Sequence, residues 1–252
     1  MRPLDHAGKS VRATRTQPRR VGLARALSKM GHCSRSQAAV LIRDGRVQLN
    51  GRVRRDPETP VDCDIDKISV GERQVAAREF VYIALNKPRG VVTTASDEKG
   101  RATVYDYLDQ DLPWVAPVGR LDKASEGLLL LTNDSEWAAR ILAPNSLVGK
   151  TYHVQIHSSD PQSVAKAVER GIESAGEVLR VRRVSVLRQG RRNAWLEIVL
   201  DEGKNRHIRR MLEARGVDVL RLIRVAIGSL VLGTLAKGQT RKISLLEKNA
   251  LG

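Results

Sequence analysis

The chain has 252 residues, 41% of them hydrophobic, and its 44 Lys and Arg side chains outnumber 28 Asp and Glu, for a formal net charge of +16. So large an apolar fraction provides for buried cores, which excludes a chain that is disordered throughout. Aromatic residues make up only 3%. This argues against a sheet that grips bases with stacked rings, so a nucleic-acid partner should be held mainly by charge.

The N-terminal end is basic and lacks an apolar stretch, so residues 1–20 are predicted to form a disordered arm, with a transit peptide as the alternative. No run of 18 apolar residues predicts a membrane span. Cys33, Cys63 and the five scattered histidines give neither a disulfide scaffold nor metal-ligand spacing. We therefore expect no metal and a reducing, cytoplasmic location.

The next segment has the pattern of a small helical module. Apolar spacing predicts one helix over residues 21–30 and a second that begins after Ser34 and ends at Gly45. Asn50-Gly51 predicts a tight hairpin turn between two short strands, and residues 64–70 predict a closing strand. These elements predict a first domain over residues 21–72.

This first part of the chain is also the more basic one. Residues 1–75 hold 16 basic and 8 acidic side chains, more net charge per residue than the remainder carries. Such a density indicates contact with a phosphate backbone, although a solvated basic surface has the same composition. Helix, helix and hairpin together resemble the RNA-binding module first recognised in ribosomal small-subunit protein four, with a small charged α+β cap as the alternative. The resemblance implies RNA contacts at Arg35 and Arg43.

The polar residues 73–79 predict a linker to a second domain over residues 80–247. In that domain the strands mostly return through hairpins and helices are few, which predicts an α+β fold with a mixed, mostly antiparallel sheet and flanking helices. The predicted strands are 81–85, 91–94, 128–131, 152–156, 178–187, 195–200 and several within 217–244, and the predicted helices are 135–142, 161–170 and 206–214.

Three segments of this domain carry residues suited to chemistry. In the first, residues 119–122 read Gly-Arg-Leu-Asp and come shortly before an apolar strand, which sets the Asp122 carboxylate in a loop on a rigid element. Taken alone, Asp122 is more simply a structural ion pair with Arg120 or Lys123.

The second segment, Gly149 to Tyr152, resembles the end of a phosphate-binding loop, but Pro144 stands where that loop needs a glycine. A nucleoside-triphosphate site is thereby excluded, and Tyr152 alone is more simply a core residue. In the third, residues 202–212, a helix would place Arg206, Arg209 and Arg210 along one edge, suited to phosphates or to a carboxylate. A solvated basic helix is the alternative.

Taken together, residues 86–90, 119–134, 150–152 and 202–211 resemble, in order and spacing, the RsuA/RluB-type family of ribosomal RNA pseudouridine synthases. The run from Gly119 to Asp134 is the most specific of them, and it favours a catalytic Asp122 over a structural one. The resemblance implies that a uridine in RNA is isomerised to pseudouridine without a metal, nucleotide or redox cofactor. It also implies the pseudouridine synthase fold and a base flipped out of its helix.

The resemblance implies four catalytic positions. Asp122 is the essential aspartate, Tyr152 packs on the target base, Arg209 is the basic partner of the aspartate, and Leu222 packs beneath the site. His207 stands where relatives usually have Gln, a departure that could alter RNA contacts. The expected RNA contacts are Arg35, Arg43, Lys87, Arg89, Arg120, Lys204, Arg206 and Arg210.

The expected partner is ribosomal RNA or a pre-ribosomal particle. Large-subunit RNA is favoured because the basic run from Leu220 to Arg224 resembles that of the large-subunit enzymes. The protein is expected to be a monomer that needs no membrane. A non-catalytic RNA-binding or ribosome-assembly factor on the same fold is the alternative function. A methyltransferase is disfavoured because no glycine-rich loop follows a strand.

Overall fold

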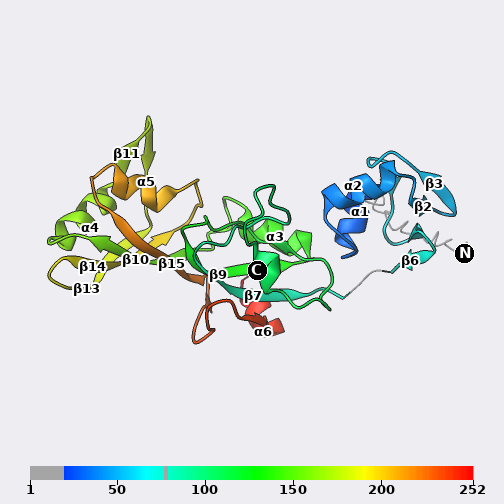
Figure 1. Cartoon of the computed structure of the whole chain (residues 1–252). Coiled ribbons are helices and arrows are strands. Elements are labelled where there is room, and N and C mark those ends of the chain that lie inside the picture. The colour runs from blue at the N-terminus through cyan, green and yellow to red at the C-terminus, as the bar shows by residue number, and fades with distance from the viewer. Residues whose placement is uncertain (1–19, 77–78, 252) are drawn as a thin grey trace, which may run out of the picture. The chain divides into compact units, whose positions relative to one another are not determined.

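The computed structural model describes residues 20–76 and 79–251, which divide into two compact units (Figure 1). Of the described residues, the first unit contains 20–27 and 35–75, and the second contains 28–34, Ala76 and 79–251. The predicted arm, residues 1–20, lies outside the described residues except for Arg20. In the described part of the chain, no helix has the length and apolar character needed to cross a membrane.

The first unit has the two helices and the hairpin that the sequence predicts. Gly45 has a φ of 73°, and Asn50 and Gly51 have φ values of 53° and 77°, as the helix stop and the tight turn require. A four-stranded sheet has the order β3-β2-β5-β6, and β1 pairs with β4. The elements are β1 Val21–Gly22, α1 Leu23–Lys29, α2 Arg35–Arg43, β2 Val47–Leu49, β3 Arg52–Arg54, β4 Pro60–Val61, β5 Ile68–Val70 and β6 Arg73–Val75.

Two predictions for this unit are wrong. The closing strand is only β5, because the Asp66 carboxylate accepts a hydrogen bond of 2.8 Å from the Asp62 N–H and folds residues 62–66 into a turn. Residues 73–75, assigned above to the linker, form β6, which pairs antiparallel with β5 across a turn at Gly71 (φ 58°). The first unit therefore extends to Val75.

The second unit is built on a nine-stranded sheet with the order β13-β14-β10-β15-β9-β7-β17, to which β16 adds on β15 and β8 adds on β9. Only β15 and β9 run parallel, so the sheet is mixed and mostly antiparallel, as predicted. A separate hairpin joins β11 and β12. The strands are β7 Tyr82–Lys87, β8 Ala116–Pro117, β9 Glu126–Thr132, β10 Lys150–His157, β11 Ile172–Ser174, β12 Glu177–Leu179, β13 Arg183–Gln189, β14 Asn193–Leu200, β15 Val219–Ile227, β16 Leu230–Val231 and β17 Thr240–Lys242.

Capping side chains mark the start of two helices of this unit. The Asp134 carboxylate accepts from the N–H of Trp137 at the start of α3, and Asp160 accepts from the N–H of Ser163 at the start of α4. The capped helices α3 and α4 are both predicted from the sequence, whereas α6 is not. The helices are the 3₁₀ turn η1 Val104–Tyr107, α3 Ser135–Leu142, α4 Pro161–Arg170, α5 His207–Glu213 and α6 Leu245–Ala250.

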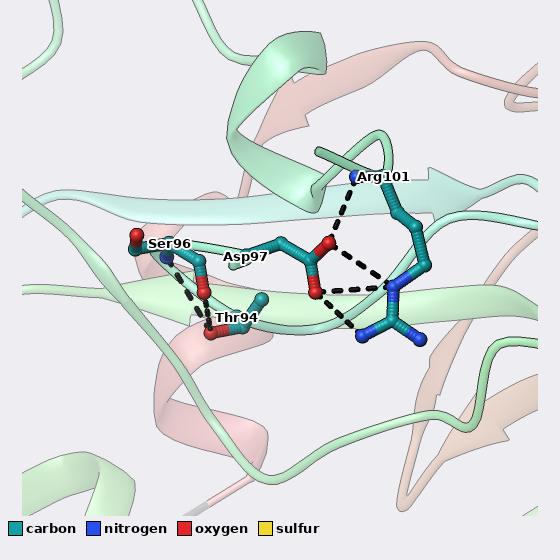
Figure 2. Close-up of polar contacts among 4 residues, drawn as sticks. All are labelled: Thr94, Ser96, Asp97 and Arg101. Carbon is teal, nitrogen blue, oxygen red and sulfur yellow. Dashed lines mark hydrogen bonds and ion pairs between the residues drawn. The ribbon is translucent and has the colours of Figure 1, made fainter. Parts of the chain in front are cut away.

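Two other predicted strands differ from the structure. Residues 91–94 form only a single bridge, from Val92 to Thr103, and the loop between them is held by the Asp97 carboxylate, which accepts three side-chain bonds and one backbone bond from Arg101 (Figure 2). Thr94 and Ser96 bond to each other in the same loop. The predicted strand 178–187 is divided into β12 and β13, which pair with different partners.

The second unit has hydrophobic clusters on both faces of its sheet. Leu129 and Leu131 of β9 belong to one cluster, with Tyr152 and Leu222, whereas Leu128 and Leu130 belong to the other. Alternate side chains of a strand point to opposite faces, so β9 is buried on both sides. Trp137 of α3 covers the second face, and α4 packs along β13 and β14 (Figure 1).

Candidate active site

A cavity of about 580 Å³ lies in the second unit and is lined by six of the twelve expected catalytic and RNA-contact residues. Its wall includes Asp122, Tyr152 and Leu222, three of the four expected catalytic positions. Arg120, Lys204 and Arg206 from the expected RNA contacts also line it. Motifs that are up to a hundred residues apart in the sequence therefore meet at one site.

The register of β10 and β15 explains this meeting. Tyr152 lies opposite Arg224, and Val154 lies opposite Leu222, so Tyr152, Leu222 and Arg224 share one face of the sheet. The loop with Asp122 leads into β9, which runs parallel beside β15 and pairs Gly127 with Arg224. The half-buried Asp122 is thus held next to the strand that carries Leu222.

Gly127 is required for this contact between β9 and β15. Its φ is +104°, and a Cβ there would lie 2.3 Å from the carbonyl oxygen of Arg224. Any larger residue would push the two backbones apart. The glycine of the Glu-Gly-Leu-Leu motif therefore sets how closely the Asp122 loop approaches β15.

Lys87 has a different place from the one expected. Its side chain is fully buried, and its Nζ donates to the carbonyl oxygens of Pro88, Asp122 and Ser125 at 3.0, 3.2 and 2.8 Å. Burial lowers its pKa to about 8, although Asp122 and Glu126 oppose that shift. The prediction that Lys87 contacts RNA is wrong, because this ammonium ties down the backbone of the Asp122 loop.

Arg209 lies behind the same loop and is 8% exposed. Its Nη2 donates to the carbonyl oxygen of Ala124 at 3.0 Å. Burial and the neighbouring Arg206 lower the pKa of Arg209, and Asp122 counteracts that shift. Arg209 and Asp122, both described, form no ion pair within 4.0 Å, so the direct contact of the arginine with this loop is its bond to the Ala124 carbonyl.

The remaining expected RNA contacts fall into two groups. Arg89 and Arg120 are exposed, and Arg35 and Arg43 are exposed on α2 of the first unit. Lys204, Arg206 and Arg210 are already engaged by carboxylates. Lys204 pairs with Glu177 and Glu202 at 2.9 Å, Arg206 pairs with Glu213, and Arg210 pairs with Glu177.

Three cavity residues were missed or misplaced by the sequence analysis. Arg224 is 5% exposed and donates from Nε to the Leu128 carbonyl, and Lys150 donates from Nζ to the Asp201 carbonyl. Lys150 shares the face of Tyr152 because side chains alternate along β10, and Arg224 shares it because the register places Arg224 directly opposite Tyr152. No pattern in the sequence reveals that register. His207 is 3% exposed in the cavity wall, and burial lowers its pKa, so it is a neutral wall residue and not a surface cation.

A half-buried carboxylate in a cavity with Lys150 and Arg224 in its walls and exposed arginines beside it, on a mixed sheet, is the site of an enzyme that acts on a nucleic acid. Two family models match the chain: RNA pseudouridylate synthase over residues 81–214 and the S4 domain over residues 21–63. The chain belongs to the RNA pseudouridine synthase family.

Individual relatives agree with this assignment. An uncharacterized RNA pseudouridine synthase of Mycobacterium tuberculosis is 37% identical over 240 residues, which cover 94% of this chain and 93% of that protein. Ribosomal large subunit pseudouridine synthase B of Bacillus subtilis is 34% identical over 224 residues, covering 88% of this chain and 91% of that one. A crystal structure of a pseudouridylate synthase matches 92% of this chain and all of its own, with a TM-score of 0.65 and 28% identity.

Proposed function

We propose that the protein isomerises a specific uridine of ribosomal RNA to pseudouridine, and that large-subunit RNA is its substrate. The observation that carries this proposal is the meeting of Asp122, Tyr152 and Leu222 in one cavity. The likeness to the Bacillus subtilis large-subunit enzyme supports the choice of RNA. The protein would act in the cytoplasm, as a monomer, on ribosomal RNA or a pre-ribosomal particle.

The reaction rearranges one nucleotide and needs no redox change. The bond between N1 of uracil and C1′ of ribose breaks, the uracil turns in place, and C5 bonds to C1′. The proton lost from C5 is balanced by a proton gained at N1, so the atoms balance without a cofactor. The enzyme must therefore supply a nucleophile or base, hold the detached uracil and keep water out.

The described side chains suit these roles. Asp122 would attack or deprotonate the ribose, Tyr152 would pack on the uracil and assist removal of the C5 proton, and Leu222 would form an apolar floor. Arg209 and Lys87 would fix the Asp122 loop from behind. The cavity volume, about 580 Å³, is in the range of single-ligand pockets and far too small for a duplex. The target nucleotide must therefore be flipped out of its helix.

Mapping pseudouridines in the ribosomal RNA of a strain that lacks this gene tests the proposal. We expect one or a few sites in large-subunit RNA to revert to uridine and to be restored when the gene is returned. A pseudouridine map identical to that of the parent would contradict the proposal. A binding-only assembly factor, the alternative function, would give that unchanged map together with altered ribosome assembly.

A further inference from the structure

The sheet of the second unit has a basic, partly exposed face opposite the one that carries the cavity. In β14 the side chains of Leu196 and Ile198 enter the core with Val168 of α4, whereas Trp195 and Glu197 point the other way. Helix α4 therefore covers the first face, and Trp195 remains partly exposed on the second.

Four side chains form a continuous row across this second face. The register places Arg188 of β13 opposite Trp195 of β14, Trp195 opposite Gln155 of β10, and Gln155 opposite Arg221 of β15. We call this the Trp195 row. Both guanidinium groups approach the indole: the Cζ atoms of Arg188 and Arg221 lie 5.2 and 5.7 Å from the ring centroid. Those distances are within the range of cation–π attraction.

The acidic groups on this face do not cancel its positive charge. Glu197 forms an ion pair with Arg183 at 2.7 Å. The buried Glu126 forms ion pairs with Arg221 at 2.9 Å and with Lys237 at 2.7 Å. Arg188 and the turn residues Arg191 and Arg192 are exposed, and none of the three pairs with a described carboxylate within 4.0 Å. Three cations are thus free to meet an anionic partner beside an aromatic ring.

The same face is hollowed further along its strands. A second cavity of about 670 Å³ is lined by Thr151, Arg183 and Val199. These three lie opposite one another in a cross-strand row that is parallel to the Trp195 row and four residues further along β14. Arg182, which is paired with Asp201 at 2.6 Å, lines it as well. A chain of phosphates that leaves the Trp195 row along the strands would therefore meet two further arginines, each of which is already paired with a carboxylate.

We propose that the Trp195 row is a second RNA-binding surface, which takes an unpaired stretch of the substrate RNA on the side of the sheet away from the active-site cavity. One base stacks on the indole of Trp195 after the exposed Arg188 side chain swings aside, and Arg188, Arg191 and Arg192 contact the flanking phosphates. Arg221 stays in place because Glu126 holds it. An aromatic ring within a line of cations is the usual way in which proteins bind single strands. The identity of the partner as RNA rests on the proposed function.

Tryptophan fluorescence of the full-length protein tests this surface directly. The other two tryptophans are shielded, since Trp137 is fully buried and Trp114 stacks on Tyr105. A fluorescence change that is seen in the wild type and lost in Trp195→Leu therefore comes from Trp195. The probe is an oligouridine of about twelve nucleotides, and inorganic polyphosphate of equal charge is the base-free control. We expect oligouridine to quench the fluorescence of the wild type but not that of Trp195→Leu, and polyphosphate to leave it unchanged.

A matched pair of charge variants completes the test. Arg188→Gln should weaken oligouridine binding about fivefold, whereas Arg170→Gln, which removes an equally exposed arginine from α4 on the other side, should change it by less than about twofold. Equal effects of the two variants, quenching by polyphosphate, or quenching that persists in Trp195→Leu would each overturn the inference.

This experiment needs no turnover, so it separates the two proposals. Wild-type protein that makes pseudouridine but shows no quenching dependent on Trp195 would refute the second surface alone. Wild-type protein that shows the quenching but makes no pseudouridine would refute the proposed function and leave an RNA-binding surface in place.

Discussion

At the scale of single residues, the Asp122 loop depends on two buried cations that contact its backbone. Lys87 donates to the carbonyls of Asp122 and Ser125, and Arg209 donates to that of Ala124. Both side chains are buried, so their hydrogen bonds and their fields are stronger than they would be at the surface. We expect both to act on catalysis by positioning the loop.

Lys87→Met should lower turnover at saturating RNA by at least about tenfold and lower the free energy of unfolding by about 2 kcal/mol, because three carbonyl oxygens lose their donor. RNA affinity should stay within about twofold of the wild type, since the side chain is buried. Single-turnover kinetics, thermal unfolding and filter binding measure these three quantities. A variant with weaker binding and an unchanged rate would restore Lys87 to the RNA contacts.

Turnover should also fall as pH rises through about 8, where the folded protein loses the Lys87 proton. The pKa of Lys87 is lower in the folded protein than in the unfolded chain. At a pH between the two values the unfolded state therefore binds more protons, so this group makes unfolding less favourable as the pH rises. The loss of rate should therefore occur without unfolding. In Lys87→Met this alkaline decline should be absent, and a decline of equal size would rule out Lys87 as its source.

Arg209→Lys should retain appreciable activity because a cation remains behind the loop, whereas Arg209→Met should lose at least about tenfold more. Single-turnover rates at saturating RNA distinguish the two variants. If Arg209 only contacted phosphate, Arg209→Met would weaken RNA binding and would reduce the slope of log affinity against log salt concentration by about one unit. The single-turnover rate at saturating RNA would then be unchanged.

At the scale of elements, the parallel pairing of β9 and β15 is the contact on which the site depends. Gly127→Ala should destabilise the second unit by roughly 3 kcal/mol, because its Cβ would meet the Arg224 backbone. Gly90→Ala is the matched control. Gly90 has a similar φ of +94°, but a Cβ at this position would have no neighbouring atom within 4 Å. The Gly90→Ala variant should therefore lose only about 1 kcal/mol of unfolding free energy. Equal unfolding free energies for the two variants would mean that β9 and β15 can separate without loss.

There is a physical reason why the sequence predicts some helices and strands and misses others. Helices α3 and α4 are predicted closely because they have eight and ten residues, enough for an apolar stripe to recur, whereas the six-residue α6 is missed although Ser244 caps it. Strand β6 has only three residues, two of them polar, and Val92 makes only a single bridge. Periodicity over so few residues cannot distinguish a short paired strand from a linker.

The site itself was predictable to a similar extent. Asp122, Tyr152 and Leu222 follow from motif resemblance, and the structure places all three in one cavity. The burial of Lys87 was not predictable, because a Lys-Pro-Arg-Gly turn gives no sign of which side chain points inward. Arg224 belongs to the cavity wall because the register between β10 and β15 sets it opposite Tyr152, and that register cannot be read from the sequence.

At the scale of the whole molecule, RNA affinity and catalysis should be separable between the two units. The double variant Arg35→Gln/Arg43→Gln removes two exposed cations from α2 of the first unit. We expect the variant to bind ribosomal RNA more weakly and the slope of log affinity against log salt concentration to become shallower by about two units. The rate of pseudouridine formation at saturating RNA should be unchanged. An unchanged salt dependence would mean that α2 does not contact the phosphate backbone.

We expect this chain to be a catalyst whose reaction depends on Asp122. The most direct test compares wild type and Asp122→Asn for pseudouridine formed in unmodified large-subunit ribosomal RNA, with binding of the same RNA measured alongside. We expect product from the wild type, none from Asp122→Asn, and affinities within about twofold of each other. Turnover by Asp122→Asn within about tenfold of the wild type would contradict it.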